Sequence, residues 1–323
     1  MIRSSCVFAL ALCATVPCQA QKPPPGYPEK PLRFVIPYPP SGGADVIARA
    51  VAPGLSTVLG RAVAVDNRPG AGGMIGTEIV ARAPADGYTF LLTTPGPLTI
   101  NASLYSKMPY DPLRDFVPVS MLASYSTVLT VHPSLPVRSV KDLIALARAK
   151  PGQLQYSSGG IGTTQHLSGE LLKYMAGVDL VHVPYKGGGP AFADLLAGHV
   201  PLSFATPGLA IPQAASGRLR LLAVSSPRRS PALPDVPAMS ETLPGFDAVA
   251  WIGFFAPAGT SPEITHFLQR EMVRILQTAA VRESLARNSF EVEAMGPEDF
   301  AQYYRRDFEK WAKVIAKAGI KAD

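Results

Sequence analysis

Short apolar runs alternate with amphipathic segments along most of this 323-residue chain. The runs have the length of strands, as in Leu32–Ile36, Thr89–Thr93 and Trp251–Ala256, and each is followed by a turn or a helical pattern. The first helix is expected over Val46–Leu59, with a kink or break at Pro53-Gly54. Apolar strands that alternate with helices are typical of parallel sheets covered on both faces.

The alternation occurs in two blocks, which predicts two α/β domains, each with a mostly parallel sheet flanked by helices. The extended segment Val117–Val131 is expected to pass from the first domain into the second as one strand, and the chain returns after Ser225. Two lobes joined by two crossings of the chain are typical of a hinged binding protein. We expect domain 1 over residues 24–122 and 227–323, domain 2 over 123–226, and hinge strands near 119–131 and 219–226. Further strands are expected at 62–66, 154–157, 180–184, 201–205 and 219–225, and further helices at 139–150, 164–175, 186–197, 210–216, 262–279, 281–287 and 297–318.

Two glycine-containing loops each follow a strand and precede a helix. Pro37–Asp45 contains Gly42 and Gly43, and Ser157–Thr164 has a similar composition. The Asp45 carboxylate is placed to cap the first helix and to occupy its first turn. Such loops direct backbone N–H groups and the positive end of a helix dipole toward one point, which suits an anion. Two facing loops predict a cleft that closes on a small acid.

A third glycine-rich stretch, Asn67–Gly76, precedes a helix that runs through Arg82. Its glycines at positions 70, 72 and 76 do not have the spacing of the dinucleotide fingerprint, and the stretch lacks the Gly-Lys-Ser/Thr of a P-loop. We interpret these glycines as a tight turn that lets the helix pack on the sheet. Contact with a ligand is the alternative.

The N-terminal 20 residues have the pattern of a secretory signal peptide. Arg3 forms a short basic region, Val7–Val16 an apolar region, and Cys18-Gln-Ala20 a cleavage site before Gln21. A membrane anchor and a lipid anchor on Cys18 are the alternatives, although the apolar run is shorter than the ~20 residues that span a bilayer. All three cysteines lie in this segment, so the mature chain would have no disulfide, thiol nucleophile or thiolate metal site.

Composition and charge exclude several classes of protein. The hydrophobic content of 47% with 17% charged residues is that of a globular domain, not of a disordered chain. The formal net charge is +6, but the basic residues are scattered, which indicates solvated surfaces and no nucleic-acid partner. No Gly-x-Ser-x-Gly or His-Glu-x-x-His motif occurs in the sequence. We therefore expect no catalytic residue, metal or cofactor, and a secreted α/β hydrolase acting on a small ester or amide stays the alternative.

The sequence closely resembles the Bug receptor family, the extracytoplasmic solute receptors of tripartite tricarboxylate transporters. The similarity covers nearly the whole chain after the signal segment, in order. The matching segments are Tyr27-Pro-x-Lys-Pro31, Pro37-Tyr-Pro-Pro-x-Gly-Gly-x-Asp45, Asp66-Asn-Arg-Pro-Gly-Ala-Gly-Gly73, Ala85-Asp-Gly-Tyr88, Gly162-Thr163 with His166, Val181-His-Val-Pro-Tyr-Lys-Gly-Gly-Gly-Pro190, Arg229-Ser-Pro-Ala-Leu-Pro-Asp-Val-Pro237 and Ala256-Pro-Ala-Gly259.

The resemblance implies a periplasmic, two-domain receptor with a type II-like venus-flytrap fold that binds organic carboxylates. It places a ligand carboxylate between the loops at Tyr38–Asp45 and Ser157–Thr164, held by backbone N–H groups, hydroxyls and waters. The first loop departs from the family's Gly-Gly-Gly-Thr-Asp, because Ser41 adds a hydroxyl and Ala44 removes one. The expected partners are the membrane subunits of a transporter, or a sensor kinase, and we expect a monomer.

Candidate ligand-binding residues come from the two loops, from a third helix start and from two strand ends. The hydroxyls of Thr163 and Thr164 can equally cap a helix, and His166 can be a structural side chain. Lys186 can contact a second carboxylate or face solvent. The candidates are Tyr38, Pro40, Ser41, Gly42, Gly43, Ala44, Asp45, Thr94, Ser158, Gly159, Gly160, Gly162, Thr163, Thr164, His166, Lys186, Gly187 and Thr206.

Overall fold

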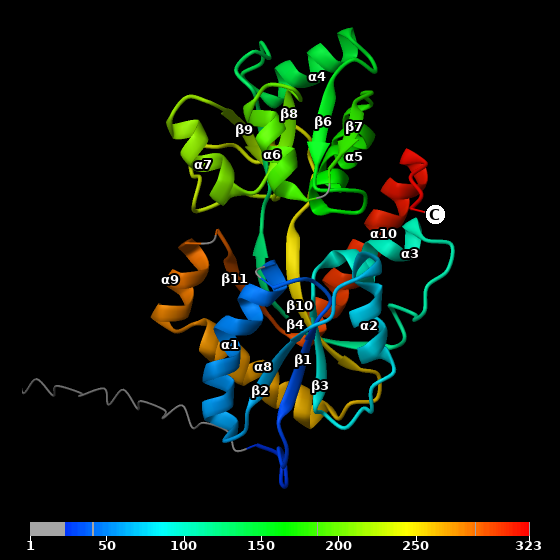
Figure 1. Ribbon diagram of the computed structural model, residues 1–323, viewed down its shortest axis with the longest axis vertical. Helices are drawn as coiled ribbons and strands as arrows, with labels where there is room; N and C mark the ends of the chain where they lie inside the picture. Colours follow the sequence, from blue (N-terminus) through cyan, green and yellow to red (C-terminus); the bar gives the residue numbers. More distant parts are fainter. Residues whose placement is uncertain (1–22, 41, 186, 288, 323) are drawn as a thin grey trace, which may run out of the picture.

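The computed structural model of the protein describes residues 23–40, 42–185, 187–287 and 289–322. The expected signal peptide, Ser41 and Lys186 lie outside the described residues. Two sheets form two lobes stacked along the long axis of the molecule (Figure 1). Lobe 1 holds six strands in the order β11-β4-β10-β3-β1-β2, and lobe 2 holds five in the order β7-β6-β8-β5-β9.

The sheet of lobe 1 combines parallel and antiparallel pairs. Its strands are β1 (Leu32–Ile36), β2 (Val63–Asn67), β3 (Thr89–Thr93), β4 (Phe116–Tyr125), β10 (Ala250–Pro257) and β11 (Glu291–Met295). β1 pairs in parallel with β2 and β3, whereas β10 is antiparallel to both β3 and β4. The sheet of lobe 1 is therefore mixed, with parallel pairs around β1 and antiparallel pairs around β10, whereas a mostly parallel sheet was expected. β4 leaves for lobe 2 and β10 returns from it, so the two strands must run in opposite directions. Strand β11 was not expected from the sequence.

Helices cover both faces of this sheet. On one face, α1 (Gly43–Leu59) and α8 (Pro262–Leu276) pack against Phe34 and Ile36 of β1. On the other, α2 (Met74–Ala81) and α10 (Pro297–Ala318) pack against Val35, because successive side chains of a strand point to opposite faces. Helix α1 begins earlier than predicted and continues through Pro53, so the expected break does not occur.

Lobe 2 repeats the arrangement on a smaller scale. Strand β5 is antiparallel to its neighbours β8 and β9, and β6 pairs in parallel with β7 and β8. The strands are β5 (Val128–Val131), β6 (Gln155–Ser158), β7 (Val181–Pro184), β8 (Leu202–Ala205) and β9 (Arg220–Val224), and the helices are α4 (Val140–Ala149), α5 (Thr164–Ala176), α6 (Gly188–Leu196) and α7 (Pro207–Ala215). The remaining helices of the described chain are η1 (Ala71–Gly73), η2 (Gly96–Ile100), α3 (Asn101–Leu104), η3 (Met239–Glu241) and α9 (Ala279–Arg287).

The two crossings between the lobes lie side by side. The segment expected as one strand, Val117–Val131, is divided into β4 and β5, which belong to different sheets. At the crossing the N–H of Thr127 donates to Ser225 Oγ over 2.9 Å, and the N–H of Ser225 donates to the carbonyl of Thr127 over 2.8 Å. The division of this segment into two strands is a tertiary effect, since the extended chain leaves one sheet and joins the other.

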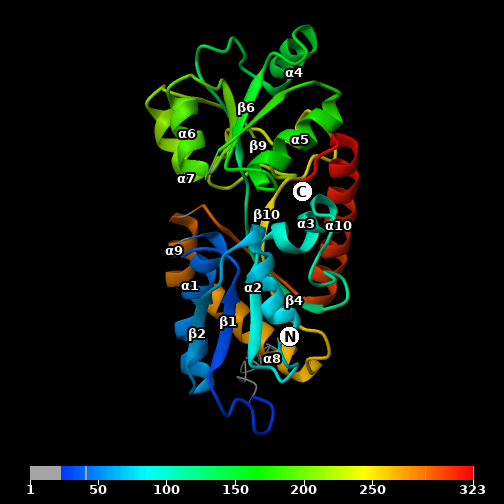
Figure 2. The same ribbon diagram turned by 45° about the vertical axis from the view of Figure 1, so that its right-hand side comes forward.

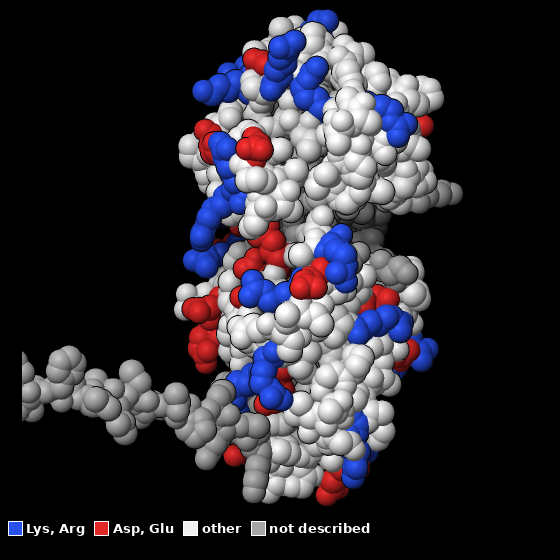
Figure 3. All heavy atoms as spheres, turned by 90° about the vertical axis from the view of Figure 1, so that its left-hand side faces the viewer, with Lys and Arg blue, Asp and Glu red and all other residues white. Residues whose placement is uncertain are grey.

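Helix α10 contacts both lobes. Phe300 and Tyr304 in its first half belong to the core of lobe 1, whereas Trp311 and Ile315 in its second half pack with residues of α5 in lobe 2. Figure 2 shows α10 running alongside the junction of the lobes. Every helix in the described part of the chain is too short or too polar to span a bilayer. Figure 3 shows acidic and basic side chains on both lobes of one face, in keeping with the scattered charges of the sequence.

Candidate ligand-binding cleft

A cleft of about 910 Å³ lies between the two lobes. Loops at the carboxyl ends of β1, β2 and β3 form its lobe 1 side, and the loops before α5 and α6 form its lobe 2 side. This position follows from the topology, because the carboxyl ends of parallel strands in an open α/β sheet leave a crevice between their connections.

Nine of the sequence-predicted residues line this cleft. They are Tyr38, Pro40, Gly42, Gly43, Thr94, Gly162, Thr163, Thr164 and Gly187. Seven others do not line it, and they are Ala44, Asp45, Ser158, Gly159, Gly160, His166 and Thr206. Ser41 and Lys186 lie outside the described residues. The two loops are therefore brought together as expected, but several of their residues do not line the cleft.

Asp45 holds the first loop in place from inside lobe 1. The N-cap of α1 is Gly42, so the expectation that Asp45 caps the helix is wrong, although Asp45 does lie in the first turn. Its buried carboxylate pairs with Arg49 over 2.9 Å and accepts a hydrogen bond of 3.0 Å from Asn67 Nδ2. Asn67 Nδ2 also donates to the carbonyl of Tyr38. These contacts connect the first loop to the end of β2.

Tyr38 lies across the ends of β1 and β3. Its hydroxyl is 2.5 Å from Thr94 Oγ1, and either oxygen can donate. Burial raises the pKa of Tyr38 to about 12, so the phenol is neutral. A Cβ at Gly96 would lie 3.1 Å from the Tyr38 hydroxyl, so the absence of a side chain at Gly96 leaves room for the phenol.

Thr163 caps α5, and it also lines the cleft. Its Oγ1 accepts a hydrogen bond from the N–H of His166 and donates to the carbonyl of Gly160 over 2.8 Å. Gly162 adopts a left-handed φ of 77°, and a Cβ there would lie 3.0 Å from Leu104 of lobe 1. The second loop thus approaches lobe 1 closely at Gly162.

His166 acts as a structural residue behind the second loop. Its Nδ1 accepts a hydrogen bond of 3.1 Å from the N–H of Gly162, and its ring stacks on His182 with centroids 4.0 Å apart. His182 Nε2 lies 2.6 Å from Ser158 Oγ, which also accepts from the N–H of Gly160. Burial, and then the charge of Lys173, lowers the pKa of His166 to about 4. The ring is therefore neutral near pH 7 and can accept this bond.

The third glycine-rich stretch contributes to the cleft as well as to packing. Gly70, Gly72 and Gly73 line the cleft beside Pro69, and their contact with a ligand stays a prediction. Gly76 has the expected packing role, because a Cβ there would lie 2.7 Å from the carbonyl oxygen of Arg68.

Further cleft residues were not expected from the sequence. They are Pro37, Pro39, Gly96, Asn101, Leu104, Tyr105, Tyr125, Ile161 and Gly188. Pro37, Pro39 and Ile161 do belong to the two predicted loops, and Gly188 to the segment that ends at Pro190. No local motif marks the others, which reach the cleft from η2, from α3 and from the end of β4.

The electrostatics of the cleft come from backbone groups. Residues at the N-terminal ends of α1, α5 and α6 all line it, and these ends carry the positive poles of the helix dipoles. Among the described lining residues there is no Lys, Arg, His, Asp or Glu. Nor do the described residues contain a group of three or more His, Cys, Asp or Glu that could hold a metal ion. Neutral donors at three helix starts can hold an anion.

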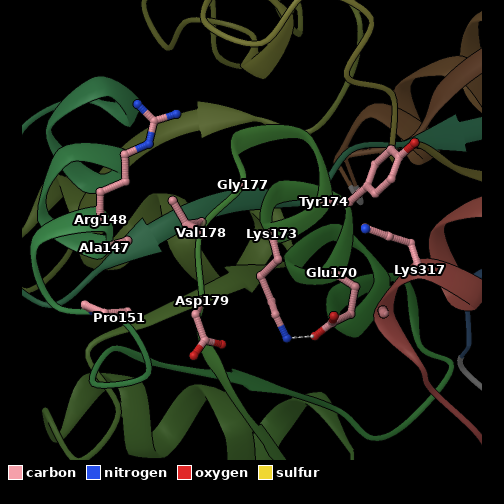
Figure 4. Close-up of a pocket in the computed structure, with 11 residues that line it drawn as sticks. Ala147, Arg148, Pro151, Glu170, Lys173, Tyr174, Gly177, Val178, Asp179 and Lys317 are labelled. Carbon is pink, nitrogen blue, oxygen red and sulfur yellow. Dashed lines mark hydrogen bonds and ion pairs between the residues drawn. The ribbon is translucent and has the colours of Figure 1, made fainter.

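A second cavity, of about 500 Å³, lies in lobe 2 between α4, α5 and the end of α10 (Figure 4). Three of its charged side chains, those of Lys173, Glu170 and Arg148, have partners within the protein. Lys173 pairs with Glu170 over 2.9 Å, and Arg148 donates to the carbonyl of Ala176. None of the glycine-loop residues lines this cavity, so it is separate from the cleft.

Two α/β lobes, paired crossings and a cleft with three helix starts define the class of two-lobed solute-binding proteins. The sequence model described as the tripartite tricarboxylate transporter family receptor (TctC) matches residues 47–320. The chain belongs to this family of receptors.

Individual proteins with similar sequences or structures are consistent with membership in this family. BugT of Bordetella pertussis is 38% identical over 297 residues, which cover 91% of each chain. A solved structure of Rpa4515 from R. palustris with adipate is 37% identical, with a TM-score of 0.78, and covers 91% of this chain and 99% of that one. The solved structure of MatC from Rhodopseudomonas palustris with bound malate is 29% identical, with a TM-score of 0.74. The match covers 90% of this chain and 100% of that one.

Proposed function

We propose that this protein is a periplasmic receptor that captures a small organic carboxylate in the interlobe cleft. The observation that carries the proposal is the convergence of three helix N-termini on a cleft without a charged side chain among its described lining residues. Adipate and malate in two solved relatives support a carboxylate as the ligand. Membership in a receptor family favours binding over the hydrolase alternative.

Capture would proceed by closure of two hinged domains. We place the domains at residues 24–122 with 227–323 and at 123–226, and the hinge at Leu122–Leu129 and Ala223–Ser226. The hydrogen bonds that join Thr127 to Ser225 support this position, because they hold the two crossings side by side. Signal-peptide export, a monomeric state and delivery to the membrane subunits of a transporter, or to a sensor kinase, complete the proposal.

The proposal is tested by thermal unfolding of the chain from Gln21 onward, refolded to remove any bound ligand. The protein is scanned with a panel of carboxylic acids and with the matching amides, which keep the shape but lack the charge. A ligand at a hundred times its Kd stabilises the folded state by about 2.7 kcal/mol. We expect at least one acid to raise the midpoint while its amide does not. Failure of every acid, with no small acid found by mass spectrometry of the protein as purified, would contradict the proposal.

Gly42→Val tests whether the first loop contacts the ligand. A Cβ at Gly42 has only ordinary contacts, 3.5 Å from the Pro39 carbonyl oxygen, so the side chain would take up cleft space. Gly43→Val is less informative, since its Cβ would lie 3.3 Å from Phe290 inside the protein. The control is Gly208→Val, at an exposed position outside the cleft. We expect Gly42→Val to weaken binding of the acid and the control to leave it unchanged.

A further inference from the structure

Two polar side chains line the cleft away from the glycine loops. Asn101 is the first residue of α3, and Tyr105 directly follows this helix, so both belong to the lobe 1 side. The carboxylate of the ligand is proposed to bind at the starts of α1, α5 and α6, which are other elements. The hydrogen-bonding groups of Asn101 and Tyr105 are therefore candidates for contact with a different part of the ligand.

The amide of Asn101 is held in one orientation and keeps hydrogen-bonding capacity. The residue is 4% exposed, and its Nδ2 donates to the carbonyl of Gly72 over 3.0 Å. An amide has two N–H donors and one acceptor oxygen, so this bond leaves one N–H and the oxygen. Within the described residues Oδ1 accepts no hydrogen bond, and it is not sealed from solvent. The free part of the amide thus faces an opening, which is the cleft that Asn101 lines.

The hydroxyl of Tyr105 lies beside this amide. Gly72 has a left-handed φ of 62°, and a Cβ on it would lie 3.2 Å from Asn101 Nδ2, 3.8 Å from Asn101 Oδ1 and 3.3 Å from the Tyr105 hydroxyl. The hydroxyl makes no hydrogen bond within the described part of the chain. Because Gly72 has no side chain, a ligand oxygen near this point would be within hydrogen-bonding reach of both residues.

The cleft is large enough for one acid to reach the helix starts and this pair of side chains. Its volume of about 910 Å³ is that of a pocket for a whole small molecule, far more than one carboxylate fills. Helix α3 also comes close to the second glycine loop, because a Cβ at Gly162 would lie 3.0 Å from Leu104. An acid bound at the start of α5 can therefore extend along α3.

We propose that Asn101 and Tyr105 form a second polar subsite, which binds an oxygen group carried elsewhere on the acid, a second carboxylate or a hydroxyl. The Tyr105 hydroxyl and the free amide N–H donate to that oxygen, and Asn101 Oδ1 accepts from it when it is a hydroxyl. The inference rests on the proposed function and names the residues that select such acids over acids with a plain hydrocarbon end. A plain end would displace water from these groups and leave them unpaired, which is costly.

Two series of acids test the selection by isothermal titration of the ligand-free protein. Hexanoate, 6-hydroxyhexanoate and adipate form one series, and benzoate, 4-hydroxybenzoate and terephthalate form the other. In at least one series we expect an acid with the second oxygen group to bind with a Kd at least roughly tenfold lower than the plain acid. A plain acid that binds as tightly as its derivatives in both series overturns the inference and leaves the receptor proposal standing. If no acid of either series binds, the inference falls, and the wider panel decides the receptor proposal.

Tyr105→Phe removes one hydroxyl and keeps the ring. We expect the advantage of the oxygen-bearing acid over the plain acid to fall roughly tenfold, while the Kd of the plain acid is unchanged. Tyr174→Phe, at an exposed tyrosine outside the cleft, is the control and should change neither Kd. Asn101→Ala should reduce the same advantage, with folding checked by circular dichroism. The full advantage retained in either folded variant, or an equal loss for both acids in Tyr105→Phe, overturns the assignment.

Discussion

The stacked histidines behind the second glycine loop predict a loss of stability at mildly acidic pH. His166 is 2% exposed, and the faces of the pair are surrounded by Tyr156, Glu170 and Lys173. Burial lowers the pKa of His166 to about 4, and the pKa of His182 is also lowered to about 4, by burial and then by His166. In the unfolded chain each imidazole has a pKa of about 6.5.

The direction and the size of the effect follow from proton binding. Between about pH 6.5 and pH 4 the unfolded chain binds protons that the folded chain does not, so the free energy of unfolding falls as the pH falls through this window. Above the window both states hold neutral rings and the full stability is present. For His166 alone, a folded pKa of about 4 gives a loss of about 2 kcal/mol at pH 5.

Urea unfolding at about pH 7.5 and about pH 5 measures this loss. His166→Asn keeps an acceptor oxygen for the N–H of Gly162 but cannot titrate, so the difference in free energy between the two pH values should shrink by about 2 kcal/mol. His266→Asn, at an exposed position on α8, is the control and should leave the difference unchanged. An equal difference in His166→Asn and the unmodified protein would refute the reasoning.

Two further predictions concern hinge motion and the core of lobe 1. Small-angle scattering should show a smaller radius of gyration with a bound acid than without it, and identical curves at saturation would contradict hinge closure. Asp307→Ala should lower the free energy of unfolding by about 3 kcal/mol, because the buried carboxylate accepts from Thr99 and Trp251 and pairs with Lys310 over 2.8 Å. Glu309→Ala, an exposed position on the same helix, is the control, and an equal loss in both variants would count against this explanation.

Local sequence patterns predicted much of the fold. Strand β1 and helix α10 have the bounds that the apolar periodicity indicates, because each element buries one regular set of side chains. The strand–loop–helix order at Pro37–Asp45 and Ser157–Thr164 also predicted loops that line one cleft. Signals of this kind are carried by neighbours in the chain, so they need no knowledge of the tertiary arrangement.

Other features were decided by contacts between distant segments. Asp45 closes the first predicted loop and His166 follows the second, but packing turns their side chains inward, toward Arg49 and His182. Tyr105 and Ile161 line the same cleft only because the lobes face each other. Whether a loop side chain supports the cleft or lines it depends on which partners the fold brings within hydrogen-bonding or packing distance. The amino-acid sequence by itself determined the loops and their glycines, and the tertiary structure decided which of their atoms a ligand can reach.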